Sequence, residues 1–161
     1  PRTMRRVLFV CTGNICRSPT AEAIFRRQVR DAGLEHLIEA DSAGTHGYHV
    51  GEPPDARSQA AARTRGYDLA PLRARQVGKA DFAAFDHLIA MDRGHQSILT
   101  RLAPAHGAHK VRLMMSYASG SGYDEVSDPY YGGPDGFELV LDLLEAASQG
   151  LLRAIMRDLR G

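Results

Sequence analysis

The chain alternates between short apolar runs and longer stretches in which apolar side chains recur every three or four residues. Arg6–Val10 is dominated by aliphatic and aromatic residues, a pattern typical of a buried strand. Helical spacing follows over Pro19–Ala32, with proline in the first turn and Gly33 just past the end. This part of the chain therefore predicts a strand followed by a helix.

The same alternation continues toward the C-terminus. Three more strands and three more helices are expected there, at Leu37–Ala43, Ala56–Arg65, His87–Met91, Arg93–Leu102, Val111–Met115 and Asp135 to about Leu159. No repeat or linker divides the chain, so we expect one domain over residues 1–161, with Pro1–Met4 disordered or left over from cloning. The pattern predicts an α/β fold with a four-stranded parallel sheet and helices on both faces, the flavodoxin-like doubly wound arrangement.

Two connecting segments differ in composition from the rest. Residues 11–18, after the first strand, read Cys-Thr-Gly-Asn-Ile-Cys-Arg-Ser. Ser116–Gly133 is long and rich in Gly, Ser, Asp and Tyr, and a loop of that length inside a compact domain is usually functional. Ligands of doubly wound folds bind beyond the carboxyl ends of the strands, which makes residues 11–18 a candidate site.

Composition and charge narrow the class of protein. The chain is 43% hydrophobic and 24% charged, as is ordinary for a soluble globular protein, and its net charge of +1 does not favour nucleic acid as a partner. The apolar run Val7–Val10 is too short for a signal peptide or a membrane span. Cys11 and Cys16 are the only cysteines, too few for a secreted disulfide scaffold. We therefore expect a cytoplasmic protein that does not bind membranes.

The spacing Cys-x5-Arg-Ser between a strand and a helix suits the binding of a phosphate group. Successive backbone N–H groups can surround an anion, and Gly13 is expected to let the loop turn. A helix beginning near Ser18 adds its positive end, and the planar fork of Arg17 can bind two oxygens. The same surroundings favour the thiolate of Cys11, a nucleophile that could form a cysteinyl-phosphate intermediate without a metal.

Taken alone, this pattern has simpler interpretations. A cysteine after a buried strand is often only a small apolar side chain in the core. Zinc binding is not expected, because no Cys or His cluster at the usual spacing supplies the remaining ligands. The motifs in the rest of the chain decide between these interpretations.

Residues 7–22, Val-Leu-Phe-Val-Cys-Thr-Gly-Asn-Ile-Cys-Arg-Ser-Pro-Thr-Ala-Glu, closely resemble the opening of the low-molecular-weight protein tyrosine phosphatases. Residues 128–132, Asp-Pro-Tyr-Tyr-Gly, resemble the second motif of that family. Family-like pairs also occur in order between the two motifs, at Asp41-Ser42, Arg75-Gln76, Asp81-Phe82 and Met91-Asp92. The resemblance implies metal-independent hydrolysis of phosphotyrosine in proteins, with no cofactor.

The resemblance also implies roles for individual residues. Cys11 resembles the nucleophile, Arg17 the phosphate-binding arginine and Asp128 the general acid, a function that typically contributes about 10²–10⁴-fold to the rate. The rest of the phosphate-binding loop is Thr12, Gly13, Asn14, Ile15, Cys16 and Ser18, in which Asn14 resembles the residue that supports the loop and Ser18 the hydroxyl that stabilises the thiolate. Ser42 is expected behind the loop. The tyrosines expected to line the substrate cleft are Tyr48, Tyr130 and Tyr131.

Two positions are less clear. In the family, the cysteine at the position of Cys16 can form a reversible disulfide with the oxidised nucleophile, but Cys16 could equally be a packing residue. Leu72 stands where the family often has a histidine that joins the hydrogen-bond network of the loop.

The implied partners are phosphotyrosine-containing proteins, a cognate tyrosine kinase, and phosphate as product or inhibitor. Protein arginine phosphatases and arsenate reductases share the loop pattern and are alternatives. Those reductases use additional C-terminal cysteines, and none follows Cys16. The arginine phosphatases tend to have a smaller polar residue at the position of Ile15 and lack the tyrosine pair. A catalytically silent phosphotyrosine-binding module would need neither Cys11 nor Asp128.

Overall fold

The sheet consists of four parallel strands in a computed structural model that describes residues 4–130 and 132–161. The strands are β1 (Arg5–Cys11), β2 (Ile38–Gly44), β3 (His87–Ala90) and β4 (Val111–Leu113). Their spatial order is β2-β1-β3-β4, with every neighbouring pair parallel. The chain leaves β1 for β2 on one side and later returns to β3 on the other, so the topological switch point lies between β1 and β3.

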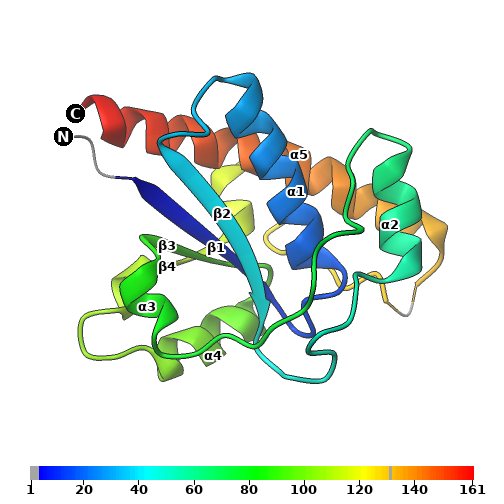
Figure 1. Ribbon diagram of the computed structural model, residues 1–161, viewed down its shortest axis with the longest axis horizontal. Helices are drawn as coiled ribbons and strands as arrows, with labels where there is room; N and C mark the ends of the chain where they lie inside the picture. The colour runs from blue at the N-terminus through cyan, green and yellow to red at the C-terminus, as the bar shows by residue number, and fades with distance from the viewer. Residues whose placement is uncertain (1–3, 131) are drawn as a thin grey trace.

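Helices cover both faces of the sheet, which confirms the predicted fold class. They are α1 (Arg17–Asp31), α2 (Ala56–Arg63), α3 (Asp81–Ala84), α4 (Arg93–Leu102) and α5 (Pro134–Arg160). In Figure 1, α1 and α5 lie above the sheet, and α3 and α4 lie below it. The start of β1 and the end of α5 lie close together in the same view.

Alternation along β1 divides the core into two parts. Val7, Phe9 and Cys11 belong to the cluster that contains the buried side chains of α1 and α5. Leu8 and Val10 belong to the cluster on the α3 and α4 face. Because successive side chains of a strand point to opposite faces, a continuous apolar run is what a strand covered on both sides requires.

The structure corrects the predicted end of the fourth strand. β4 ends at Leu113, and Met114–Tyr117 forms a 3-10 helix (η2) that packs against α5. Met114 and Met115 both belong to the core cluster on the α1 and α5 face, whereas a strand would direct one of them to the opposite face. Gly150 of α5 permits this packing, because a Cβ there would overlap the carbonyl oxygen of Tyr117.

Two further short elements were not predicted, and two helix limits moved by two residues. The four residues of α3 and the three of the 3-10 helix η1 (Ala108–Lys110) are too short to show a hydrophobic period. Helix α1 begins at Arg17, two residues earlier than its pattern indicated, and α2 ends at Arg63 before the left-handed Gly66. Of the segment Pro1–Met4, residues 1–3 lie outside the described residues.

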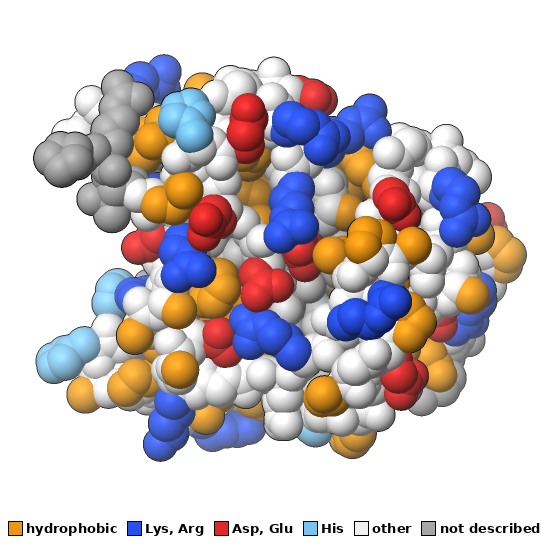
Figure 2. All heavy atoms as spheres, viewed as in Figure 1, with side chains coloured by type: hydrophobic (Ala, Val, Ile, Leu, Met, Phe, Trp, Pro, Cys, Tyr) orange, Lys and Arg blue, Asp and Glu red, His pale blue; other side chains and the backbone are white. Residues whose placement is uncertain are grey.

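The surface carries both signs of charge. On the face shown in Figure 2, Lys and Arg side chains lie beside Asp and Glu side chains and do not gather into one basic patch. Across residues 4–130 and 132–161, no helix is long and apolar enough to cross a membrane.

Candidate active site

The loop of residues 11–18 joins the end of β1 to the start of α1. Its beginning is held by the segment after β2: the carbonyl of Cys11 accepts a hydrogen bond from the Thr45 N–H (2.8 Å), and the carbonyl of Thr12 accepts one from the His46 N–H (3.0 Å). Gly44 permits this approach, because a Cβ there would lie 2.6 Å from the Thr12 carbonyl oxygen. The site therefore forms where β1 and β2 end, as parallel strands require.

The left-handed residue of this loop is Asn14, with φ of 59°, and not Gly13 as the sequence suggested. Asparagine tolerates that conformation better than most residues, because its short polar side chain can bond locally. Gly13 is required for a different reason. A Cβ at Gly13 would lie 2.8 Å from the ring of His49, so the glycine lets the opposite wall approach the loop.

The side chain of Asn14 fastens the loop from behind. Its amide nitrogen donates to the Ser18 hydroxyl (2.7 Å) and to the Ser42 hydroxyl (3.0 Å), and its oxygen accepts the Arg75 N–H (3.0 Å). Ser42 in turn donates to the buried carboxyl of Glu22 (2.7 Å). Burial raises the pKa of Glu22, and the hydrogen bond from Ser42 offsets only part of that effect. Ser42 thus lies behind the loop, as predicted.

Ser18 places its hydroxyl beside the Cys11 sulfur. The two atoms are 2.9 Å apart, and the Ser18 backbone N–H also points at the sulfur (3.4 Å). The Ser18 oxygen accepts a hydrogen bond from Asn14, and its own proton faces two acceptors, the sulfur at 2.9 Å and, farther away, the Ala43 carbonyl oxygen at 3.4 Å. Two groups of Ser18, the hydroxyl and the backbone N–H, are therefore directed at one buried sulfur.

Arg17 is buried and held on two sides. One guanidinium nitrogen, Nη1, donates to Asp92 Oδ2 (2.9 Å) and to the carbonyl oxygen of Val126 (2.9 Å). Burial raises the pKa of Asp92, but the hydrogen bond from the His95 backbone N–H and the attraction of Arg17 outweigh it, and the pKa falls below its usual value. Asp92 lies just after the end of β3, and Arg17 lies just after the loop that follows β1. The ion pair of Asp92 and Arg17 therefore spans the switch point between these two strands.

Asp128 lies on the open side of the site. Its Oδ2 is 3.6 Å from Arg17 Nη2, and its Oδ1 accepts the Tyr130 N–H (2.9 Å). The side chain is 43% exposed, in contrast to that of Arg17, which is 3% exposed. More than a hundred residues separate Asp128 from Cys11 in the sequence, yet both line one cavity.

That cavity has a volume of about 270 Å³. The residues that line it are Cys11, Thr12, Gly13, Ile15, Cys16, Arg17, Tyr48, His49, Asp128 and Tyr130. Tyr48 is stacked on His46, with ring centroids 4.9 Å apart. Tyr130 lies under the guanidinium of Arg57, 5.2 Å from it. Of the three predicted wall tyrosines, Tyr48 and Tyr130 line the cavity, and Tyr131 lies outside the described residues.

This geometry is accompanied by sequence similarity to a known protein family. The model of the low molecular weight phosphotyrosine protein phosphatase family matches residues 6–160. The chain belongs to this family. The predicted resemblance is therefore confirmed over nearly the whole sequence.

Relatives of this phosphatase family match along their full length. A low molecular weight protein-tyrosine-phosphatase of Streptomyces coelicolor is 54% identical over 97% of this chain and 96% of its own length. The crystal structure of YfkJ from Bacillus subtilis is 41% identical, with a TM-score of 0.91 and 97% of each chain covered. The structure of Wzb from Vibrio vulnificus, in complex with benzylphosphonate, is 27% identical, with a TM-score of 0.81 and coverage of 94% of this chain and 99% of that one.

Several residues of the phosphatase site were not singled out from the sequence. Asp92, Arg75 and Glu22 occur in the family-like segments, but their contacts with Arg17, Asn14 and Ser42 were not foreseen. His95 was missed altogether, although it is buried and its ring lies 2.8 Å from the Thr12 hydroxyl. Helical spacing from Asp92, which caps α4, could have placed it on the side facing the loop.

Leu72 and Cys16 each pack in or against a core cluster. Leu72 is half-buried against the main core and borders a hollow that Glu22 also lines, while the Arg75 N–H satisfies the Asn14 oxygen. Burial raises the pKa of Cys16 to about 12, although a hydrogen bond with Ser58 acts in the opposite direction. Both cysteines are free thiols.

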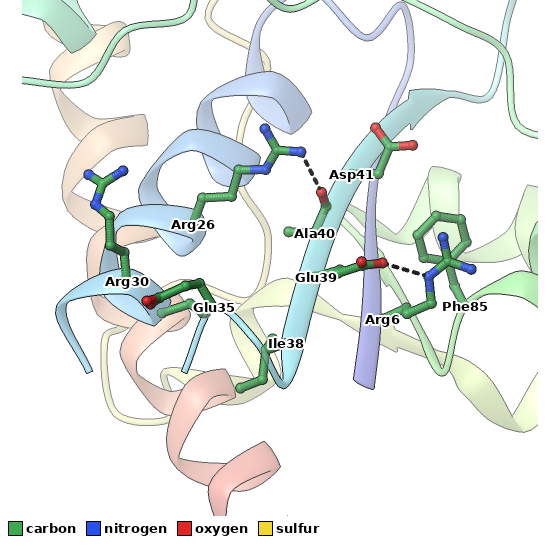
Figure 3. Close-up of a pocket in the computed structure, with 10 residues that line it drawn as sticks. Arg6, Arg26, Arg30, Glu35, Ile38, Glu39, Ala40, Asp41 and Phe85 are labelled. Carbon is green, nitrogen blue, oxygen red and sulfur yellow. Dashed lines mark hydrogen bonds and ion pairs between the residues drawn. The ribbon is translucent and has the colours of Figure 1, made fainter. Parts of the chain in front are cut away.

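A larger hollow of about 670 Å³ lies along β2, away from the phosphatase site. Figure 3 shows that Arg26 reaches across it to the carbonyl of Ala40, and that Arg6 pairs with Glu39. Because the Ala40 carbonyl is on the outer edge of the sheet, Arg26 blocks a position at which another strand could pair. Among the described residues, no cysteine lines this hollow, and Arg6 and Glu39 of its lining form an ion pair.

Proposed function

We propose that this chain hydrolyses phosphotyrosine in proteins, with Cys11 as nucleophile, Arg17 as the phosphate-binding residue and Asp128 as general acid. The observation that carries the proposal is that these three residues line one cavity, together with Thr12, Gly13, Ile15 and Cys16. A nucleophile, a fixed cation and an exposed carboxyl group around one anion-sized space are the components of phosphoryl transfer through a covalent intermediate.

In the first half-reaction, the Cys11 thiolate attacks phosphorus, so that a sulfur–phosphorus bond forms and the bond from phosphorus to the phenolic oxygen breaks. Asp128 gives its proton to the departing oxygen, which leaves as tyrosine hydroxyl. Arg17 and the loop N–H groups bind the phosphoryl oxygens. Because Asp92 and the Val126 carbonyl already hold Arg17, little reorganisation is needed as charge develops.

In the second half-reaction, the Asp128 carboxylate takes a proton from water, and the resulting nucleophile attacks phosphorus. The sulfur–phosphorus bond breaks, phosphate leaves and the Cys11 thiolate is restored. The two donors of Ser18 that point at the sulfur stabilise it as a leaving group. The charge stabilisation in both steps comes from Arg17 and backbone dipoles, so the proposed chemistry is metal-independent.

The walls of the cavity support an aromatic substrate. Tyr48 and Tyr130 can contact a substrate ring, and offset or edge contacts between rings are favourable. Benzylphosphonate, bound in the Vibrio vulnificus structure, is a ring that carries a phosphonate group and so has the shape of this substrate class. By the same argument, Tyr131 is proposed as a further wall residue, and phosphate as the product and a competing ligand.

The proposed partners are phosphotyrosine-containing proteins and a cognate tyrosine kinase, and the proposed location is the cytoplasm. We also propose that Cys16 protects Cys11 from over-oxidation, since both thiols line the same cavity. Peroxide treatment followed by peptide mass spectrometry tests this point. A disulfide-linked Cys11–Cys16 peptide is expected, and sulfinic Cys11 with free Cys16 would contradict it.

Comparing the turnover of phosphotyrosine, phosphoarginine and phosphoserine peptides of one sequence, in chelator and without added metal, tests the proposed function. Turnover is expected to be fastest for phosphotyrosine and to be lost in Cys11→Ser. Cys16→Ser is the matched control, because it makes the same change in the neighbouring cysteine of the loop. Preference for phosphoarginine would favour the arginine phosphatase alternative, and persistent activity in Cys11→Ser would exclude the covalent mechanism.

A further inference from the structure

His95 is a buried side chain to which the proposed chemistry assigns no role. It lies in the first turn of α4, and its ring nitrogen Nε2 is 2.8 Å from the hydroxyl of Thr12, across a sequence separation of 83 residues. Burial and the positive charge of Arg17 lower the pKa of His95 to about 4, while Asp92 and Asp128 act in the opposite direction and His46 adds to the lowering. The imidazole is therefore neutral near pH 7.

The contacts of His95 are part of a closed ring of hydrogen bonds. The His95 backbone N–H donates to Asp92 Oδ1 (3.0 Å), and Asp92 Oδ2 accepts from Arg17 Nη1 (2.9 Å). Arg17 Nη2 reaches the Thr12 hydroxyl oxygen at 3.5 Å, and that hydroxyl returns to the imidazole of His95. The ring thus joins the residue after the nucleophile, the phosphate-binding arginine and the first turn of α4.

The tautomer of His95 decides which groups of this ring donate and which accept. His95 Nδ1 lies 3.1 Å from Asp92 Oδ1, at an angle too poor for a hydrogen bond, but close enough for the carboxylate to favour a proton on that nitrogen. Nε2 then accepts the Thr12 hydroxyl proton. The lone pairs of the Thr12 oxygen remain available to Arg17.

Arg17 has a competing partner on the open side of the site. Asp128 Oδ2 is 3.6 Å from Nη2, the same nitrogen that faces the Thr12 hydroxyl. A guanidinium group that turned toward Asp128 would pair with the proposed acid and would leave the phosphate oxygens. A contact that keeps Nη2 on the loop side therefore serves both phosphate binding and proton donation by Asp128.

We propose that His95 is a positioning residue, which acts through the Thr12 hydroxyl to hold Arg17 in its phosphate-binding orientation. This inference rests on the proposed function, but it concerns phosphate affinity, which can be measured without turnover. Arg17 binds phosphate in the ground state and in the transition state alike. Loss of the contact is therefore expected to raise KM more than it lowers kcat.

Two quantities test the proposal in the full-length protein: the dissociation constant of inorganic phosphate from NMR titration of the loop amides, and KM and kcat for para-nitrophenyl phosphate. His95→Leu and Thr12→Val should each raise the phosphate dissociation constant about 3- to 10-fold, the net effect of one hydrogen bond. The double variant should raise the phosphate dissociation constant no further than the more strongly affected of the two single variants does, because both changes remove the same contact.

Conservative variants separate positioning from general stability. His95→Gln can present its amide oxygen near the position of Nε2, as an acceptor for the Thr12 hydroxyl proton, and should bind phosphate more tightly than His95→Leu. Thr12→Ser should likewise lose less affinity than Thr12→Val. Thr12→Val is nearly isosteric, so it remains informative if His95→Leu does not fold.

Three results would overturn the proposal. They are an unchanged phosphate dissociation constant in Thr12→Val, a double variant whose loss equals the product of the single losses, and a lower melting temperature in His95→Leu with unchanged phosphate affinity. If the proposed function failed instead, the wild-type protein would bind phosphate without turnover, and the effects of these variants on binding would still be measurable.

Discussion

The segments that supply Arg17 and Asp128 are built in different ways. Arg17 and Ser18 lie in a buried loop whose side chains bond to β2, to the segment after β3 and to the chain near Arg75. The Asp128 side chain is 43% exposed, and its segment is joined to this network at Val126, which bonds to the Met91 carbonyl and to Arg17. Phosphate binding is therefore preorganised, whereas proton transfer depends on a side chain that can adjust to each substrate.

Replacement of Asp128 tests the exposed part of the site and should have the largest effect, followed by replacement of Arg17, Asn14 and Glu22. Asp128→Asn keeps an oxygen that can accept the Tyr130 N–H but has no proton to transfer. We expect kcat for phenyl phosphates to fall about 10²–10⁴-fold with little change in KM. Steady-state kinetics over a series of leaving groups measures this loss, which should shrink as the leaving group improves.

Asp124→Asn is the matched control for Asp128→Asn, because Asp124 lies in the same segment and its side chain is 80% exposed. It should leave kcat unchanged. Equal losses across the leaving-group series would remove Asp128 as the acid.

Replacement of Arg17 tests the buried part of the site. Arg17→Lys keeps the charge but has no second nitrogen to bind phosphate while the first bonds to Asp92 and Val126. We expect kcat/KM to fall about 10²–10³-fold, the usual effect of removing a preorganised donor. Phosphate affinity should fall as well, unlike in Asp128→Asn. Arg57→Lys on α2 is the control, and a loss below tenfold in Arg17→Lys would contradict the account.

Asn14 tests how firmly the loop is fixed. Asn14→Ala removes the bonds to Ser18, Ser42 and the Arg75 N–H and places alanine, which tolerates a left-handed backbone less well than asparagine, at φ of 59°. Unfolding in urea should show a loss of about 4 kcal/mol, from about 1 kcal/mol for each of the three net hydrogen bonds and about 1 kcal/mol of backbone strain. Asn14→Gly loses the same hydrogen bonds but adopts the left-handed backbone without strain, so it should lose about 1 kcal/mol less. Equal losses would show that the left-handed backbone contributes nothing.

Glu22 tests the far end of the same network and should have the smallest effect. Its raised pKa means that the folded state binds a proton more tightly than the unfolded state, whose reference value is 4.5. As pH rises above 4.5, the wild type must ionise a buried carboxyl and loses stability, while Glu22→Gln does not. Unfolding free energies should therefore shift in favour of the variant with rising pH, by about 1.4 kcal/mol per unit of pKa difference. A constant difference between pH 4.5 and neutrality would contradict this.

The same contrast explains how far the sequence could predict the structure. The strand, the loop and the helix of residues 5–31 were predictable, because burial, Cys-x5-Arg and the first-turn proline act locally. The predicted end of β4 was wrong because Met114 and Met115 are buried where η2 packs against α5. Local sequence preferences cannot show such a tertiary contact. The helix α3 was missed because four residues show no period.

Within the site, the predictable residues are those that carry the chemistry. Cys11, Arg17 and Asp128 stand in motifs, so their meeting in one cavity could be expected. The bonds of Arg17 to Asp92 and of Thr12 to His95 join segments that become neighbours only at the switch point of the sheet. No local pattern records such contacts, so these supporting residues required the fold.

The central claim is that Cys11 carries the phosphoryl group between the two half-reactions. It is tested most directly by rapid acid quench of Asp128→Asn during turnover of a phosphotyrosine peptide, followed by peptide mass spectrometry. A phosphoryl group on the peptide that contains Cys11 is the predicted result, because the variant lacks the base that hydrolyses the intermediate. Turnover with unmodified Cys11 at every quench time, together with activity in Cys11→Ser, would contradict the account.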